Sequence, residues 1–420
     1  DGIRDSSVTG VQTCALPICT MPEPSNTLEA QDENGALIVH PFSSLHTIDG
    51  LDAMGWRSEA GLPPPKRVVL VDDTLKADTA YRLACEGTAL LWRGDFQNAK
   101  ALLQALARRA DHEKRKPRKA KEATAASKTE IFNRHRLAKS QRARTLGRLL
   151  IPFDAGHGIP LRRAPDVHEA CEAAYGEARE PYVASLRELL GIIGAYEWQK
   201  KGVDVPALGA RIYPHYGVFA PVRIEYVQLL AQTPFPTVEA PPVAFDIGTG
   251  TGVLAAVLAK RGVARVSATE RDPRALACAR DNVQRLVLTD RIEVSEEDLF
   301  PEGCAPLIVC NPPWIPARPA TPLERAVYDE EGRMLRGFLS GLKSHLAPGG
   351  EGWLILSDIA EHLGLRTRED LLAQIDAAGL MVLGKADIKP KHARASDTSD
   401  PSYAARAAEV TSLWRLGVSA

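Results

Sequence analysis

The chain has 420 residues, of which 45% are hydrophobic and 25% are charged, and its formal net charge is -1. This composition is typical of a soluble globular protein, and the balance of charge excludes an overall electrostatic preference for nucleic acid or membrane. No apolar run approaches the length needed to span a bilayer, so no membrane partner is expected. The seven cysteines form no C-x-x-C pair and no Cys/His cluster. We therefore expect no metal site and no disulfide framework, and scattered free thiols favour a cytoplasmic location.

Residues 1–20 are interpreted as an artefact of sequencing. Residues 8–18 back-translate without mismatch to a common library adapter, and residues 1–5 to the segment that precedes its index. A secretory signal is the competing interpretation, but the apolar core is short and acidic residues stand where a basic region is needed. Met21 is then a plausible native start.

Residues 21–65 are polar and rich in proline and glycine, which predicts a flexible or loosely docked arm. Residues 66–208 are expected to form an α-rich accessory region. A strand is predicted at residues 67–71, and apolar residues at helical spacing predict helices at 77–91, 97–109 and 183–202.

Residues 112–148 depart from the average composition, with thirteen Lys or Arg against three Glu, a local charge of +10. The first half is low in apolar residues and is predicted to be disordered, whereas the second half could form a basic helix. Such a density of cations suits RNA or DNA phosphates. A solvated linker kept soluble by its charge is the alternative.

Residues 211–230 form an aromatic and proline-rich loop that runs into an amphipathic helix. One interpretation is a border of a binding pocket, and the other is a loop that packs its aromatic side chains into the core.

A glycine-rich turn follows the next expected strand, at residues 243–247. The apolar run is interrupted by Asp246, and the chain then reads Gly248, Thr249, Gly250, Thr251, Gly252. Alternating glycines let the backbone turn sharply and bring a ligand against bare main chain. Because a helical pattern begins at residue 253, the loop opens onto a helix N-terminus with unpaired N–H groups.

Two further strands are expected to deliver acids to the same site. Residues 265–270 end in Glu270, which lies 22 residues after Gly248 in the sequence. At this spacing, a carboxylate at a strand end reaches the two hydroxyls of a ribose. The strand at 291–294 leads to Asp298 and Leu299, although solvated surface acids are an alternative interpretation there.

The strand at residues 306–310 delivers the most discriminating motif, Asn311, Pro312, Pro313 and Trp314. This tetrapeptide resembles the N/D-P-P-Y/F/W signature of enzymes that methylate an exocyclic amine or amide nitrogen. Such a nitrogen is a poor nucleophile because its lone pair is delocalised. The side-chain oxygen of Asn311 and the main-chain oxygen of Pro312 can both accept hydrogen bonds from such a nitrogen, which favours its more pyramidal transition state. The prolines stiffen the loop, and Trp314 offers a face on which a flat group stacks.

These motifs, in this order, resemble class I S-adenosylmethionine (SAM) methyltransferases, in particular those that methylate release-factor glutamine, guanine N2 or adenine N6. The resemblance covers about half of the chain. It implies a Rossmann-like α/β domain at residues 209–420, with a seven-stranded sheet, helices on both faces and an antiparallel last strand. It also implies SAM as cofactor and assigns the predicted site residues. Gly248, Gly250 and Gly252 would accommodate the methionine moiety, Glu270 the ribose, Asp298 and Leu299 the adenine, and Asn311, Pro312, Pro313 and Trp314 the target nitrogen. The cofactor-binding residues would also include Asp246, Thr249, Thr251 and Asn311.

The resemblance predicts a SAM-dependent N-methyltransferase, with ribosomal or other RNA as the leading substrate because of residues 112–148. A glutamine side chain in a translation protein is the second candidate, since the Asn-Pro-Pro motif serves both. Trp314 replaces the Tyr usual in the glutamine group and the Phe common in the guanine group, so it decides neither. An NAD-dependent oxidoreductase is the rival from another class, but it would leave residues 311–314 without a purpose. The oligomeric state is left open.

The basic segment yields a test of the RNA expectation. Neutralising Lys114, Arg115, Lys116, Arg118 and Lys119 together should raise the RNA dissociation constant and flatten its salt dependence, because each lost phosphate contact releases fewer counterions. Filter binding of RNA at several salt concentrations measures both quantities, and the affinity for SAM should stay unchanged. An unchanged salt slope would reduce the segment to a solubilising linker and favour a protein substrate.

Overall fold

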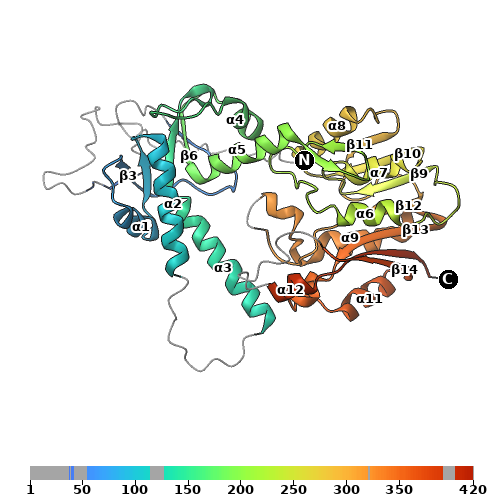
Figure 1. Cartoon of the computed structure of the whole chain (residues 1–420). Helices are drawn as coiled ribbons and strands as arrows, with labels where there is room; N and C mark the ends of the chain where they lie inside the picture. Colours follow the sequence, from blue (N-terminus) through green and yellow to red (C-terminus); the bar gives the residue numbers. More distant parts are fainter. Residues whose placement is uncertain are drawn as a thin grey trace, which may run out of the picture.

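The computed structural model of the chain describes residues 37, 39–41, 54–113, 127–319, 322–390 and 403–419. The segment interpreted as an adapter and the first half of the basic segment lie outside these residues. Figure 1 shows two α/β parts side by side, an N-terminal part in blue to green and a C-terminal part in yellow to red.

The C-terminal part is built on a seven-stranded sheet with the order β11-β10-β9-β12-β13-β15-β14. Its strands are β9 (Val243–Ile247), β10 (Arg265–Glu270), β11 (Ile292–Glu296), β12 (Ala305–Cys310), β13 (Leu346–Ser357), β14 (Leu380–Ile388) and β15 (Thr411–Val418). The first five strands are parallel, and β15 pairs antiparallel with both β13 and β14. This order and the reversed last strand confirm the predicted Rossmann-like methyltransferase fold.

Helices cover both faces of this sheet because its strands are apolar on both sides. Alternate residues of β9 and β12 fall into two separate buried clusters, one on each face of the sheet. The helices of this part are α6 (Glu225–Gln232), α7 (Val253–Lys260), α8 (Pro273–Arg285), α9 (Arg333–His345), α10 (Ile359–His362), α11 (Arg368–Ala377) and α12 (Tyr403–Ala408). Two short 3-10 turns, η3 (Pro322–Ala326) and η4 (Glu330–Gly332), lie between β12 and α9, and a small hairpin of β7 (Val203–Val205) and β8 (Ala210–Ile212) precedes the sheet.

The N-terminal part is organised around a six-stranded sheet that the sequence analysis did not foresee. Its order is β1-β3-β4-β5-β6-β2. The strands are β1 (His40–Pro41), β2 (Gly55–Trp56), β3 (Arg67–Val71), β4 (Ala89–Trp92), β5 (Leu149–Phe153) and β6 (Tyr182–Ser185). Its helices are α1 (Ala77–Cys85), α2 (Phe96–Glu113), α3 (Lys128–Leu146), α4 (His168–Tyr175) and α5 (Leu186–Lys201), and η2 (Ala155–His157) is a 3-10 turn. The expected α-rich content is present, but the helices pack on a mixed sheet.

Two helices predicted in this part were too long. The first was expected to run to residue 91, but α1 ends at Cys85, because Gly87 has a φ of 87° and turns the chain into β4. All four residues of β4 are buried, so its apolar run marks a buried strand and not a helix face. The other was expected to start at residue 183, yet residues 182–185 form β6 and the helix begins at Leu186.

The described residues of the expected flexible arm are docked. Gly55 donates its N–H to the carbonyl of Pro181 at 2.9 Å, and β2 pairs in parallel with β6 at the edge of the sheet. Hydrogen bonding to a neighbouring strand therefore fixes this stretch, and composition alone gave no sign of it. We propose residues 66–208 as the accessory region and residues 209–420 as the C-terminal domain.

Helix α3 carries the second half of the basic segment and joins the two parts of the molecule (Figure 1). Its first turn is fixed by a capping box, in which Ser127 and Glu130 exchange side-chain to backbone hydrogen bonds. Thr129 donates to the carbonyl of Gly364 at 2.9 Å, and Phe132 is buried against Ile315, Ile359 and Leu363 of the C-terminal part. The predicted basic helix is thus confirmed, and it is docked on the chain that directly follows the Asn-Pro-Pro-Trp motif.

Candidate functional site

The register of three parallel strands brings the predicted site residues to one edge of the sheet. Ile247 of β9 is level with Thr269 of β10 on one side and with Cys310 of β12 on the other. The next residue of each strand is therefore Gly248, Glu270 or Asn311, and the three leave the sheet at the same height. Carboxyl ends of parallel strands are where α/β proteins place their ligands.

The glycine loop has backbone angles that residues with a side chain rarely adopt. Gly248, Gly250 and Gly252 have φ angles of 70°, 59° and 81°, in the left-handed region. A Cβ on Gly248 would also collide with the side chain of Met334, whereas Gly250 has open space where a Cβ would stand. The loop then enters α7, so it offers bare main chain and a helix N-terminus to a ligand.

Asp246 lies beneath this loop and shapes it from below. Its carboxylate is 1% exposed and accepts hydrogen bonds from the Thr249 hydroxyl at 2.6 Å and from the Ala255 N–H at 3.0 Å. Burial raises the pKa of Asp246 to about 6, although both hydrogen bonds oppose this rise. These two hydrogen bonds hold the glycine loop, and the cofactor contact expected of Asp246 stays a prediction.

Thr251 is tied to the neighbouring helix by a residue to which the sequence analysis gave no role. Asn282 of α8 is 1% exposed and donates to the carbonyl of Thr251 at 3.1 Å. Its side-chain oxygen accepts from the N–H of Tyr213 at 2.7 Å, so Asn282 connects the glycine loop with the aromatic loop at residues 211–219. In the sequence, Asn282 stands at the helical spacing of the apolar residues of α8, between Ala279 and Val283. A polar side chain on the apolar face of a helix is a signal that could have revealed it, since a buried polar group needs hydrogen-bond partners.

Glu270 is held in place by the main chain on two sides. One carboxylate oxygen accepts from the N–H of Gly250 at 3.1 Å, and the other accepts from Arg271 and Asp272 at 2.8 and 2.9 Å. Asp272 in turn caps α8, with Pro273 at its first position. The carboxylate is therefore held in one orientation next to the glycine loop, and its contact with a ribose stays a prediction.

Asp298 and Leu299 follow β11 at the same edge of the sheet. The Asp298 carboxylate forms an ion pair with Arg333 of α9, and both side chains are 51% exposed. Leu299 has a φ of 84°, unusual for a side chain with a Cβ, and its carbonyl accepts from the Thr269 hydroxyl at 2.5 Å. Both residues lie at the same sheet edge as Glu270, and the expected adenine contact stays a prediction.

The Asn-Pro-Pro-Trp segment leaves β12 with its first and last side chains joined. The indole N–H of Trp314 donates to Oδ1 of Asn311 at 2.9 Å. The guanidinium of Arg223 stacks on the Trp314 ring at 4.9 Å from its centroid, so one face of the ring that was expected to receive a substrate is covered. Pro312 is buried, and Pro313 is partly exposed.

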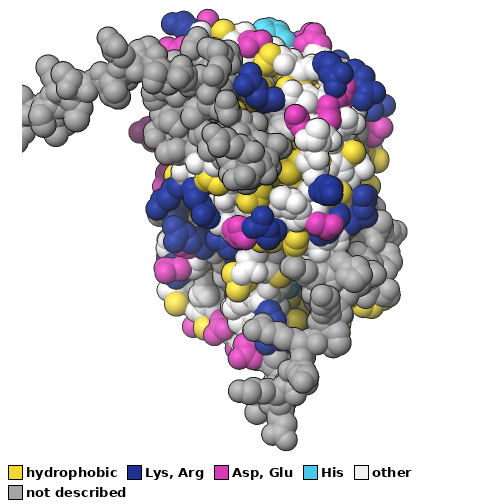
Figure 2. All heavy atoms as spheres, turned by 90° about the vertical axis from the view of Figure 1, so that its left-hand side faces the viewer, with side chains coloured by type: hydrophobic (Ala, Val, Ile, Leu, Met, Phe, Trp, Pro, Cys, Tyr) yellow, Lys and Arg dark blue, Asp and Glu magenta, His cyan; other side chains and the backbone are white. Residues whose placement is uncertain are grey.

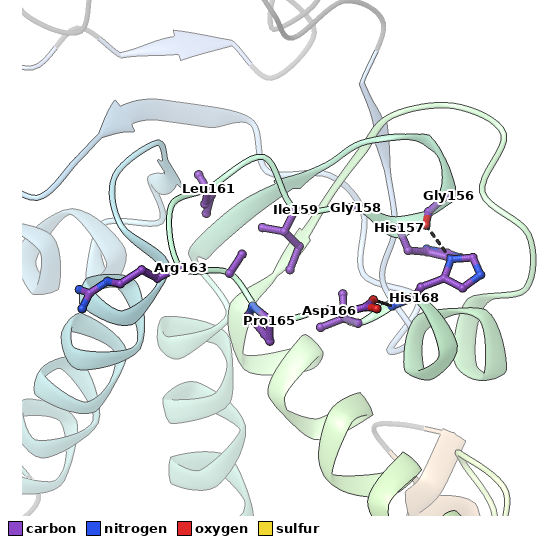
Figure 3. Close-up of a pocket in the computed structure, with 11 residues that line it drawn as sticks. Gly156, His157, Gly158, Ile159, Leu161, Arg163, Pro165, Asp166 and His168 are labelled. Atoms are coloured by element: carbon purple, nitrogen blue, oxygen red, sulfur yellow. Dashed lines mark hydrogen bonds between the residues drawn. The ribbon is translucent and has the colours of Figure 1, made fainter.

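A pocket of about 360 Å³ lies elsewhere, in the N-terminal part along residues 156–168 (Figure 3). Its polar groups are engaged within the protein. His157 contacts the Tyr182 hydroxyl and the Gly176 carbonyl, each at 2.9 Å, and His168 contacts the Gly156 carbonyl at 2.8 Å. Arg163 points away from the other lining side chains and is held by Asp95. We therefore give this pocket less weight than the edge of the seven-stranded sheet.

Among the residues that the structure describes, no three His, Cys, Asp or Glu side chains lie together as metal ligands would. Among the same residues, no helix has the length and apolar character required to cross a bilayer.

Comparison with known proteins agrees with the geometry. Residues 209–373 match the family model described as methyltransferase small domain. The match covers less than half of the chain, and it coincides with most of the seven-stranded sheet.

The chain matches only part of the length of its curated relatives. The chain is 37% identical over 151 residues to the release factor glutamine methyltransferase of Cereibacter sphaeroides, covering 34% of this chain and 48% of the relative. It is also 37% identical over 76 residues to the tRNA1(Val) (adenine(37)-N6)-methyltransferase of Histophilus somni, covering 16% and 32%. The chain thus spans less than half the length of these relatives. A solved methyltransferase structure from Pyrococcus furiosus is 20% identical, with a TM-score of 0.37, over 55% of this chain and 98% of its own.

The position of Glu270 gives a prediction for the SAM expected from the sequence. Replacing Glu270 with Ala should weaken SAM binding by about 1.5–3 kcal/mol, because a charge-assisted contact to the ribose hydroxyls is lost. Isothermal titration calorimetry measures the affinity, and Glu296→Ala is the control because Glu296 ends the neighbouring strand level with Glu270. SAM affinity equal to that of the parent would refute the ribose assignment.

Asp246 gives a prediction about stability and pH. Its folded-state pKa of about 6 lies above the value near 4 of an unfolded chain, so between these pH values the folded protein binds more protons. The free energy of unfolding should therefore fall as the pH rises from about 4 to about 6, by up to about 3 kcal/mol from this group. Above pH 6 its contribution should level off.

Asp246→Asn should remove this fall, since an amide oxygen can accept the same two hydrogen bonds without titrating. Urea unfolding across this pH range measures it, with the exposed Asp290→Asn as the control for a lost charge. Parallel stability profiles of the parent and Asp246→Asn would show that Asp246 is not the titrating group.

Proposed function

We propose that the chain is a SAM-dependent N-methyltransferase that acts on an exocyclic or amide nitrogen, with ribosomal or other RNA as the leading substrate. The observation that carries this proposal is the meeting of the glycine loop, Glu270 and Asn311 at one sheet edge, level with one another. An NAD-dependent oxidoreductase would use the loop and the acid but would leave the Asn-Pro-Pro-Trp segment without a task. Thermal-shift titration with SAM against NAD separates these two alternatives.

The residues at the edge fit SAM. The open approach to Gly250 allows close contact with main chain, and the fixed carboxylate of Glu270 suits two ribose hydroxyls. The partly exposed Asp298 could accept a hydrogen bond from the adenine amine in place of its pairing with Arg333. Bound SAM would supply an activated methyl group on a sulfonium.

The protein's own part in the reaction is to position the target nitrogen. Asn311 Oδ1 and the Pro312 carbonyl would accept hydrogen bonds from its N–H groups and hold its lone pair toward the methyl group. These acceptors favour the more pyramidal nitrogen of the transition state over the planar ground state, which is the difference that accelerates a reaction. The stiff backbone of two prolines keeps the acceptors from moving away.

The docking of α3 supports RNA as the substrate. Arg134, Lys139 and Arg144 are exposed on this helix, and no ion pair ties them to another described residue. Because Phe132 and Thr129 of α3 contact the C-terminal part close to Ile315, the start of this basic helix lies near the proposed amine site. On the face of the N-terminal part in Figure 2, Lys and Arg gather in several small groups with Asp and Glu between them. The electrostatic support for an RNA substrate therefore comes from α3 and not from this face as a whole.

A glutamine side chain of a translation protein is the second candidate. It is favoured by the match to a release factor glutamine methyltransferase, which extends over 151 residues. Transfer of labelled methyl groups from SAM to total RNA and to total protein, both from cells lacking the enzyme, distinguishes the candidates. Either substrate is consistent with a cytoplasmic protein whose described cysteines are free thiols.

Asn311 gives the most direct test of the mechanism. Asn311→Ala should bind SAM with little loss yet turn over on the order of a hundredfold more slowly, because a positioning contact is lost in the transition state. Asn311→Asp should retain more activity, since a carboxylate still accepts hydrogen bonds. Steady-state kinetics on the identified substrate gives kcat and KM, and calorimetry with SAM is the control. Normal turnover by Asn311→Ala would reduce the segment to a structural turn.

A further inference from the structure

Trp314 is restrained more closely than a platform for a substrate requires. Its N–H is engaged by Asn311 and one ring face is covered by Arg223. The ring also packs against the buried clusters on both faces of the seven-stranded sheet and against the cluster around Phe132. A side chain held in this way has one orientation, so the group to which it donates is oriented as well.

Arg223 is in turn fixed by a buried ion pair. Its guanidinium donates to Glu409 at 2.9 Å, and the Glu409 side chain is only 1% exposed. The same carboxylate oxygen accepts from the Ser357 hydroxyl at 2.7 Å, and the Ser357 oxygen accepts from the N–H of Ile359. The chain of contacts thus runs from the last strands of the sheet through Arg223 to the indole.

This ion pair is poorly suited to be a source of stability. Moving two charges out of water costs free energy. The attraction between the charges offsets this cost only when the remaining polar atoms of the pair are also hydrogen-bonded. Nε of Arg223 and Oε2 of Glu409 make no hydrogen bond within the described part of the chain. Apolar side chains of similar size would serve packing as well, which favours a role in setting geometry.

We propose that Trp314 is a positioning residue whose N–H fixes the carboxamide of Asn311, and that Arg223 and Glu409 hold the indole in the required plane. An indole N–H can only donate, so it selects the carboxamide orientation in which Oδ1, and not the NH2 group, faces it. The oxygen keeps a second lone pair for the N–H of the target amine. This inference rests on the proposed function, because it concerns how Asn311 is prepared for that amine.

The hydrogen bond donated by the N–H of Trp314 and the stacking of its aromatic ring can be tested separately. Trp314→Phe keeps an aromatic face for Arg223 but cannot donate to Asn311. Without that donor the carboxamide can turn, and Oδ1 is presented to the substrate for only part of the time. We expect kcat to fall about tenfold, the factor that corresponds to one hydrogen bond, with SAM affinity unchanged.

A double-mutant cycle shows whether this loss acts through Asn311. In the Asn311→Ala background, Trp314→Phe should lower kcat by less than twofold, because the group that it orients is already absent. A tenfold loss in both backgrounds would overturn the proposal, since Trp314 would then act independently of Asn311. A Trp314→Phe enzyme as active as the parent would overturn it as well.

The chain offers a matched control for Arg223. Arg368 stacks on Trp414 at 5.1 Å and pairs with Glu361 at 2.9 Å, the same arrangement around a different tryptophan. Arg223→Met should lower kcat severalfold, whereas Arg368→Met should leave it unchanged even if both variants melt at a lower temperature. An equal loss of kcat in the two variants would assign the effect of Arg223 to general stability and overturn its positioning role.

A spectroscopic readout does not depend on the reaction. The indole N–H resonance that is missing from Trp314→Phe identifies Trp314, and it should shift in Asn311→Ala and in Arg223→Met but not in Arg368→Met. An indole N–H chemical shift that does not change in Asn311→Ala would show that Trp314 does not donate to Asn311, and this would overturn the proposal. A parent protein that transfers no methyl group to RNA or protein overturns the proposed function instead, and the spectrum still decides the geometry.

Discussion

The level ending of parallel strands is the constraint on which the site depends. Because β10, β9 and β12 are paired in register, residues that are 22 and 63 positions from Gly248 in the sequence leave the sheet beside it. A shift of one strand by a single residue would turn its side chains to the other face and move its last residue out of line. Burial of both faces of the sheet excludes such shifts, so the apolar cores determine where the acid and the amide lie.

Asp246 shows that this arrangement has an internal cost. A carboxylate that is 1% exposed and lacks a cationic partner among its hydrogen bonds opposes folding once it ionises. From its position it holds both Thr249 and the first turn of α7. The conformation of the glycine loop and the ionisation of Asp246 are therefore connected, and a change in one affects the other.

The sequence predicted the C-terminal domain well because its signals are local. Glycines, the strand-terminal acid and the Asn-Pro-Pro-Trp segment each occupy a few adjacent residues, and the hydrophobic periods around them are long. The six-stranded sheet was missed because its short strands, such as β4 and β5, are uniformly apolar runs that a helix interior could also show. Periodicity cannot distinguish these alternatives, and pairing partners decide the outcome.

Contacts at the site between distant residues were also beyond the reach of sequence patterns. Arg223 and Glu409 are separated by 186 residues, and although Arg223 lies in the segment 211–230, no sequence pattern pairs it with Glu409. The expected stacking role of Trp314 was inferred from the motif and the residue type, and neither shows that the surroundings cover one face of the ring and engage its N–H. Residue type thus indicated which side chains matter, and packing determined what each can do.

The docking of α3 has a consequence for dividing the protein. A fragment beginning near residue 209 would contain the whole seven-stranded sheet, yet it would leave Ile315, Ile359 and Leu363 without the cover of Phe132. Arg274, at the start of α8, would also lose Glu59 and the carbonyl of Ala174. Such a fragment would present an apolar patch to water directly beside the proposed amine site, which favours self-association. A fragment cut at the boundary between the two sheets is therefore expected to be less soluble than the whole chain.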